Sequence, residues 1–191
     1  MNQMDQAGVE GMERGDVRLD IEQRARAVRM LVFDVDGVLT DGSLFYDNQG
    51  QEYKAFNSRD GHGIKMLRAS GVETGIITGR TSQIVLHRAR NLGIGQIYQG
   101  AEDKLEALQS LLRETGLAPE QIAYMGDDVV DLPVLNRCGL AITVPDAPAE
   151  VKRRSQVITL ANAGRGAARE ACELIMRAQG TWAAQIALYD R

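Results

Sequence analysis

Short apolar runs alternate along this chain with longer stretches in which apolar residues recur at helical spacing. Near-continuous apolar runs are typical of strands in a parallel sheet that is covered on both faces. The runs are Met30–Val35, Val72–Thr78, Ile122–Met125, Leu140–Val144 and Val157–Leu160. The helix-like stretches are Gly63–Ala69, Ser82–Leu92, Lys104–Thr115, Val129–Asn136 and Gly166–Ala178. We therefore predict an α/β fold, a doubly wound (Rossmann-like) parallel sheet with helices on both faces.

One segment departs from this alternation. Ser43–Tyr46 and Glu52–Asn57 flank the turn-rich residues 47–50, which predicts a β-hairpin over residues 43–57, directly after the first strand. The hairpin would carry several large apolar side chains, and exposed strand edges tend to associate unless something covers them. We expect another subunit to bury these residues, which are Leu44, Phe45, Tyr46, Tyr53 and Phe56.

Length and charge exclude several classes of protein. The 191 residues suffice for one domain, and a net charge of −4 lacks the basic face of a nucleic-acid-binding protein. No apolar run approaches the ~20 residues that a membrane span needs. The distant cysteines Cys138 and Cys172 indicate a reducing, cytoplasmic setting.

Residues 1–20 lack the apolar core of a secretory signal. We predict a disordered leader over 1–20, a single domain over 21–180 and a C-terminal tail over 181–191.

Two carboxylates follow the most apolar strand. Asp34 and Asp36 lie where parallel α/β sheets bind ligands, just beyond the carboxyl end of a strand. Carboxylates in an apolar run are costly to bury unless a cation compensates them, and a hard divalent ion prefers oxygen ligands. Gly37 allows the backbone to turn and to present amide groups to an anion.

A second acidic cluster follows the strand Ile122–Met125 and contains Asp127, Asp128 and Asp131. Aspartates are also common in turns and at helix N-caps, so one cluster alone would say little. Because the carboxyl ends of parallel strands lie at one edge of a sheet, however, the two clusters should converge. Together they predict a metal site walled by carboxylates.

Two further elements suit a phosphate. Thr78 ends a strand before Gly79 and Arg80, so its hydroxyl and the loop amides could meet a phosphate at a helix N-terminus. Lys104 opens another predicted helix and could neutralise phosphate charge.

The order of these motifs resembles the haloacid dehalogenase superfamily of phosphatases. It runs from Asp34-Val35-Asp36-Gly37-Val38-Leu39-Thr40 through Thr78 and Lys104 to Gly126-Asp127-Asp128-Val129-Val130-Asp131. The resemblance implies that Asp34 is the nucleophile, that an aspartyl-phosphate forms on it, and that Asp36 is the acid and base. It also implies Mg²⁺ held by Asp34, the backbone carbonyl of Asp36 and Asp127. Thr78 and Lys104 would bind the phosphoryl oxygens, and Asp128 and Asp131 would support the metal ligands. The segments between the motifs are too short for a cap domain.

Four segments narrow the resemblance to the 3-deoxy-D-manno-octulosonate 8-phosphate phosphatase family. They are Leu39–Gly42, Phe56–Lys65, Ile77–Ser82 and Gly164–Glu170. The resemblance implies hydrolysis of that sugar acid phosphate during lipopolysaccharide precursor biosynthesis. It also implies a homotetramer whose hairpins pack together at the centre and whose neighbouring subunits complete each site.

An acidic sugar phosphate needs cations for its carboxylate as well as for its phosphate. Arg59 and Arg80 suit this role, because arginine binds carboxylates with a two-pronged fork. Asp60 and Gly61 are placed with them in the predicted substrate-binding set. The tail Thr181–Arg191 is expected to be a docked terminus or a lid over a neighbouring site.

Two alternatives remain open. The same chemistry could act on a nonulosonate 9-phosphate or on sugar phosphates broadly. A rival of another class is a catalytically silent module kept for tetramer assembly. Against it stand four costly polar residues, namely Asp34, Asp36, Lys104 and Asp127.

Overall fold

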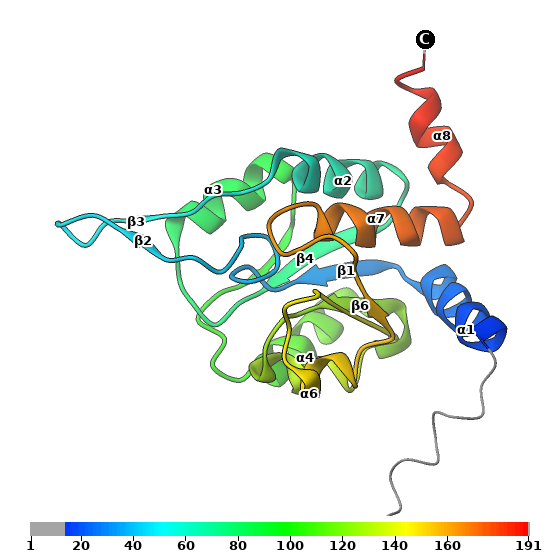
Figure 1. Ribbon diagram of the computed structural model, residues 1–191, viewed down its shortest axis with the longest axis horizontal. Helices are drawn as coiled ribbons and strands as arrows, with labels where there is room; N and C mark the ends of the chain where they lie inside the picture. Colours follow the sequence, from blue (N-terminus) through cyan, green and yellow to red (C-terminus); the bar gives the residue numbers. More distant parts are fainter. Residues whose placement is uncertain (1–13, 191) are drawn as a thin grey trace, which may run out of the picture.

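A six-stranded parallel sheet lies at the centre of the computed structural model, which describes residues 14–190 (Figure 1). The strand order is β5-β4-β1-β6-β7-β8, and each neighbouring pair is parallel. The strands are β1 Met30–Phe33, β4 Glu73–Ile77, β5 Gln96–Tyr98, β6 Ile122–Met125, β7 Leu140–Thr143 and β8 Val157–Ile158. This topology confirms the predicted doubly wound α/β fold.

Helices cover both faces of the sheet, with α2, α3 and α7 on one side and α4 and α6 on the other (Figure 1). Their bounds are α1 Arg14–Ala27, α2 Ser58–Ala69, α3 Gln83–Leu92, α4 Lys104–Thr115, α5 Leu132–Leu135, α6 Ala149–Lys152, α7 Ala167–Ala178 and α8 Trp182–Ala187. Two single turns of 3-10 helix, η1 Pro119–Gln121 and η2 Val129–Asp131, complete the described elements. Every residue of β1, β6 and β7 is buried, which explains why these strands are apolar on both faces.

Three parts of the fold differ from the sequence-based expectation. Residues 14–20 were predicted to be disordered but belong to α1, which packs against α7 through buried residues such as Ala25. Residues 1–13 of the predicted leader lie outside the described part of the chain. The edge strand β5 was not predicted, because it is short, half-buried and begins with a glutamine. The tail contains α8, and beyond it Tyr189 contacts His62 of α2 in the same chain.

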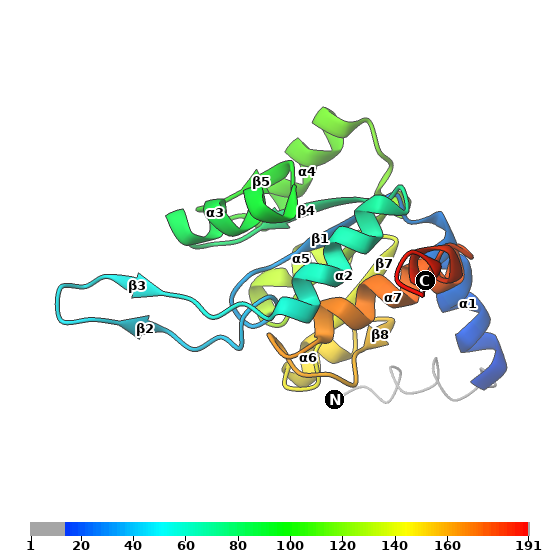
Figure 2. The same ribbon diagram turned by 90° about the horizontal axis from the view of Figure 1, so that it is seen from above.

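The predicted hairpin is present and projects from the body of the molecule (Figures 1 and 2). Its paired strands are short, β2 Phe45–Tyr46 and β3 Glu52–Tyr53. Four of its large apolar residues are between 51% and 54% exposed, namely Leu44, Phe45, Tyr46 and Tyr53. No cap domain is inserted anywhere within residues 14–190. None of the helices described is long and apolar enough to cross a membrane.

Candidate active site

Three motifs meet at the carboxyl edge of the sheet because β1 lies between β4 and β6. Phe33 is in register with Ile76 of β4 and with Met125 of β6. The backbone N–H of Asp34 donates to the carbonyl of Met125 at 2.9 Å, so the first acidic motif leaves the sheet beside the second. The end of β4 brings Thr78 to the same edge. Parallel strand ends are where such sheets bind ligands.

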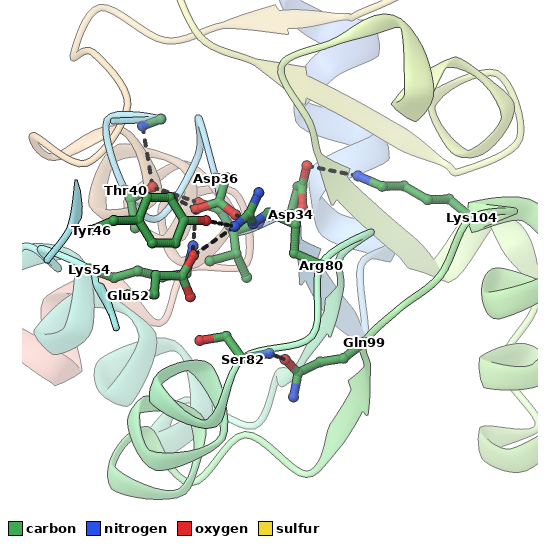
Figure 3. Close-up of polar contacts among 12 residues, drawn as sticks. Asp34, Asp36, Thr40, Tyr46, Glu52, Lys54, Arg80, Ser82, Gln99 and Lys104 are labelled. Carbon is green, nitrogen blue, oxygen red and sulfur yellow. Dashed lines mark hydrogen bonds and ion pairs between the residues drawn. The ribbon is translucent and has the colours of Figure 1, made fainter. Parts of the chain in front are cut away.

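Lys104 joins the two acidic motifs. Its Nζ lies 2.7 Å from Asp34 Oδ2 (Figure 3). The same Nζ lies 2.6 Å from Asp131 Oδ1, and the side chain of Lys104 is only 3% exposed. Burial works against the charged amine, but the two carboxylates outweigh it and raise the pKa of Lys104. For Asp34 the effect of burial prevails: it raises the pKa to about 6, with Lys104 opposing the shift and Asp131 adding to it. A buried carboxylate is therefore held in place by a permanent cation.

Asp131 is fully buried, and both of its oxygens are occupied. Oδ1 accepts from Lys104 and from the hydroxyl of Tyr124 at 2.6 Å. Oδ2 accepts from the backbone N–H groups of Asp127 and Asp128 at 2.9 and 3.1 Å. Four donors use the acceptor capacity of one carboxylate. Asp131 therefore fixes the loop that carries Asp127.

Asp127 has the properties of a metal ligand. Its Oδ1 is buried without a hydrogen-bond partner among the described residues. Oxygens of Asp34, Asp127 and Asp131 lie within 4.8 Å of one another. Burial, together with the charges of Asp34 and Asp131, raises the pKa of Asp127 to about 7. Carboxylate oxygens that repel one another across so short a span fit a hard divalent cation.

Asp36 faces the base of the hairpin rather than Lys104 (Figure 3). Its Oδ1 accepts from Lys54 Nζ, and Arg80 Nε lies 3.7 Å from its Oδ2. Arg80 also donates to Glu52 Oε1 at 3.0 Å and to the hydroxyl of Tyr46. We call Asp36, Glu52, Lys54 and Arg80 the hairpin-base charge cluster. It places two carboxyl groups beside two basic side chains.

Two of the predicted substrate-binding residues, Asp60 and Gly61, make contacts that position α2. The carboxylate of Asp60 accepts from the backbone N–H groups of Gly166 and Arg169 at 3.2 and 2.8 Å, so it caps the N-terminus of α7. Gly61 lies against Arg88, whose Nη2 would be 2.2 Å from a Cβ at position 61. Both residues thus lie where α2 packs against its neighbours, and their place in the substrate-binding set stays a prediction.

The remaining predicted residues lie at or near the carboxyl edge. Thr78 is buried and Gly79 exposed in the loop after β4, and the carbonyl of Thr78 accepts from Ala101 at 3.1 Å. Arg59 is exposed at the start of α2. Asp128 is exposed, and its side chain caps η2 by accepting from Val129.

Sequence reasoning missed Lys54 and Tyr124. Lys54 lies two positions from Glu52, and side chains two apart in a strand share a face, so the predicted strand was the available signal that the two lie together. Tyr124 is the one large polar residue in the apolar run of β6, and burial beside Asp131 raises its pKa well above the ordinary value.

Aspartates at the ends of two adjacent parallel strands, one of them paired with a buried lysine, define a class of α/β enzymes, the haloacid dehalogenase-like hydrolases. The sequence profile of that family matches residues 93–170. The 3-deoxy-D-manno-octulosonate 8-phosphate phosphatase of Escherichia coli (strain B / BL21-DE3) is 45% identical over 166 residues, which cover 87% of this chain and 88% of that protein.

Solved structures agree. The crystal structure of the phosphatase of that name from Yersinia pestis has a TM-score of 0.84 and 46% identity, covering 86% of this chain and 89% of that chain. The Moraxella catarrhalis enzyme of that name, in complex with magnesium, phosphate and KDO, has a TM-score of 0.87 and 42% identity, covering 89% and 98%. This chain belongs to the 3-deoxy-D-manno-octulosonate 8-phosphate phosphatase family.

Proposed function

We propose that this chain hydrolyses 3-deoxy-D-manno-octulosonate 8-phosphate to the free sugar acid and inorganic phosphate, through an aspartyl-phosphate on Asp34. The observation that carries the proposal is the buried contact of Asp34 with Lys104, 2.7 Å long, beside the unpartnered oxygen of Asp127. The identity to relatives that act as this phosphatase supports the choice of substrate. The proposed setting is the cytoplasm, in the synthesis of lipopolysaccharide precursors.

In the first step, a carboxylate oxygen of Asp34 attacks phosphorus and the ester P–O bond breaks. Lys104 holds Asp34 in place and offsets the repulsion between its carboxylate and the incoming phosphate dianion. Thr78 and the Gly79 amide are proposed to donate to the other phosphoryl oxygens. The leaving oxygen takes a proton from Asp36.

In the second step, Asp36 takes a proton from water, and the resulting hydroxide attacks phosphorus. The bond between Asp34 and phosphorus then breaks and releases phosphate, so that one water molecule is consumed for each ester cleaved. Splitting the reaction in this way is the advantage of covalent catalysis.

The residues present fit Mg²⁺, with Asp34, Asp127 and the backbone carbonyl of Asp36 as its proposed ligands. Bound there, the ion neutralises negative charge on the phosphate and on the carboxylates around it. Asp131 would act indirectly, through the backbone of Asp127 and Asp128, because its own oxygens are already occupied. Asp128 would contribute through the η2 turn that it caps.

Arg59 and Arg80 are the proposed partners of the substrate carboxylate. Arg80 belongs to the hairpin-base charge cluster, yet its side chain remains 45% exposed and keeps donors for a ligand. These cations favour an acidic substrate, but a nonulosonate 9-phosphate would satisfy them as well.

We also propose a homotetramer in which hairpins of neighbouring subunits pack together. The half-exposed side chains of Leu44, Phe45 and Tyr53 support this assembly, since a projecting apolar hairpin is stabilised by burial against a partner.

The test measures phosphate release with Mg²⁺ from three esters, namely 3-deoxy-D-manno-octulosonate 8-phosphate, a nonulosonate 9-phosphate and glucose 6-phosphate. Asp34→Asn is the inactive variant. Asp47→Asn, in the hairpin turn, is the matched control. We expect preference for the octulosonate ester, lost only in Asp34→Asn. Equal rates on all three esters would refute the substrate assignment, and no release from any would favour a silent assembly module.

A further inference from the structure

Lys54 is a buried amine that reaches the active site from the hairpin. Its side chain is 1% exposed, and it contacts two carboxylates, those of Asp36 and of Glu52, the latter at 3.3 Å. A buried ammonium is costly unless it is paired, so this position is specified by its partners. Because Lys54 directly follows β3, the hairpin base fixes where the amine lies.

The two oxygens of Asp36 have different surroundings. Oδ1 accepts from Lys54 and lies 3.4 Å from the hydroxyl of Thr40. Oδ2 is buried and has no hydrogen-bond partner among the described residues, with Arg80 Nε too distant at 3.7 Å. One oxygen of the carboxyl group is thus anchored, and the other is left free.

We propose that Lys54 is a positioning residue for Asp36, one that anchors Oδ1 and thereby reserves Oδ2 for proton transfer. The proposal rests on the proposed phosphatase function. An ammonium can donate hydrogen bonds but cannot accept them. Oδ1 must therefore be the accepting oxygen, and the proton of the acid form must sit on Oδ2. That proton passes to the leaving oxygen in the first step, and Oδ2 takes a proton from water in the second.

Glu52 and Arg80 complete this arrangement. Burial opposes the charge on Glu52, but hydrogen bonds from Ser82, Lys54 and Arg80 outweigh burial and lower its pKa. Glu52 is therefore an anion, and it is the second carboxylate that pairs with Lys54. Glu52 and Lys54 both come from the hairpin. The hairpin is therefore part of the active site as well as a projecting arm.

The experiment compares two substrates whose leaving groups differ. The octulosonate ester releases an alkoxide that needs a proton, whereas p-nitrophenyl phosphate releases a stable phenolate that does not. The variants are Lys54→Met and Lys54→Arg. The matched control is Gln51→Met, an exposed position on the other side of β3 in the same arm of the hairpin. The value of kcat/KM reports the first step, phosphoryl transfer to Asp34.

For Lys54→Met we expect kcat/KM for the octulosonate ester to fall about 100-fold, and that for p-nitrophenyl phosphate to stay within about threefold, because general acid catalysis contributes about 10²–10⁴. The second step slows for both esters, so p-nitrophenolate should appear in a burst. Lys54→Arg should recover most of the loss. Gln51→Met should match the wild type.

Equal losses on both esters would reduce Lys54 to a structural ion pair and overturn the proposal, as would no loss on either. If Lys54→Met does not fold, Lys54→Arg carries the same comparison, with an intermediate loss expected on the octulosonate ester alone. Absence of phosphate release by the wild type from both esters would instead overturn the proposed function, and this inference with it.

Discussion

Gly37 lies so close to Asp127 that a Cβ at position 37 would fall 2.1 Å from Asp127 Oδ2. Gly37 also has a φ of +87°, a conformation that other residues rarely adopt. The backbone of the first acidic motif therefore lies against the Asp127 carboxylate of the second. The carboxylate can occupy this position because Gly37 has no side chain.

Replacing Gly37 should damage the metal site more than the fold. Gly37→Ala adds roughly 1–2 kcal/mol of backbone strain and pushes Asp127 aside. Gly116→Ala is the matched control, because Gly116 has a φ of +69° and open space around its Cβ position. Both variants should lose similar stability in urea unfolding, but only Gly37→Ala should lose about tenfold or more in Mg²⁺ affinity by calorimetry. Equal Mg²⁺ affinities would contradict this account.

Asp131→Asn should lower both stability and Mg²⁺ affinity. The amide nitrogen of Asn would face one of the groups that now donate a hydrogen bond to Asp131. Breaking a buried ion pair such as that of Asp131 with Lys104 costs about 3 kcal/mol. The exposed neighbour serves as the control, because Asp128→Asn keeps an equally good capping residue. Chemical denaturation and Mg²⁺ titration of both variants measure the two effects. If Asp131→Asn kept its stability and its Mg²⁺ affinity, Asp131 would not hold the loop that carries Asp127.

Mg²⁺ binding should release protons below neutral pH. Because burial and two nearby carboxylates raise the pKa of Asp127 to about 7, the ion must displace a proton there. The apparent affinity should fall about tenfold per pH unit below that value. Calorimetry in buffers with different ionisation enthalpies measures the protons released, and a titration that is flat from about pH 5.5 to about pH 8 would refute the shift.

The same pKa has a consequence for stability. The folded state binds the proton of Asp127 more tightly than the unfolded state does, since the folded pKa exceeds the ordinary value of 3.8. This proton stabilises the fold fully at pH values below 3.8, and the contribution is lost as the pH rises through about 7. The increase in Tm on adding Mg²⁺ should therefore grow with pH. Asp127→Asn should remove most of this growth.

The hairpin should drive assembly. Leu44→Ser combined with Phe45→Ser removes two half-exposed apolar side chains and should shift the tetramer towards smaller species in sedimentation velocity. Leu160→Ser, at a residue that is 91% exposed on another part of the surface, is the control. A wild-type protein that sediments as a monomer would refute the assembly proposal.

The sequence predicted the central sheet well because β1, β6 and β7 are buried on both faces and read as apolar runs. Two peripheral elements, β5 and α1, were not predicted. Strand β5 has only three half-buried residues, and α1 is mostly polar, so neither has a strong pattern of its own. Contacts with distant parts of the chain stabilise such elements. In α1, for example, Arg24 Nη1 donates a hydrogen bond to the carbonyl of Gly139.

For the site, position after a strand was sufficient to predict that Asp34 and Asp127 lie close together, whereas Lys104 opens a helix and was assigned to the site from the order of the motifs. Position in the sequence could not show which way a neighbouring side chain turns. Asp60 follows a motif but points to the start of α7, and Arg80 joins the hairpin. Lys54 was missed because its partner Asp36 lies 18 positions away in the sequence, and only the course of the hairpin brings the two together.

The most direct test of the central claim is to trap the covalent intermediate. The enzyme is mixed with the octulosonate ester and Mg²⁺, quenched in acid and reduced with borohydride, which converts a phosphorylated aspartate to homoserine. We expect mass spectrometry to find homoserine at position 34, only when substrate is present. Homoserine at position 36, or an unmodified Asp34 during turnover, would contradict the assignment of Asp34 as the nucleophile.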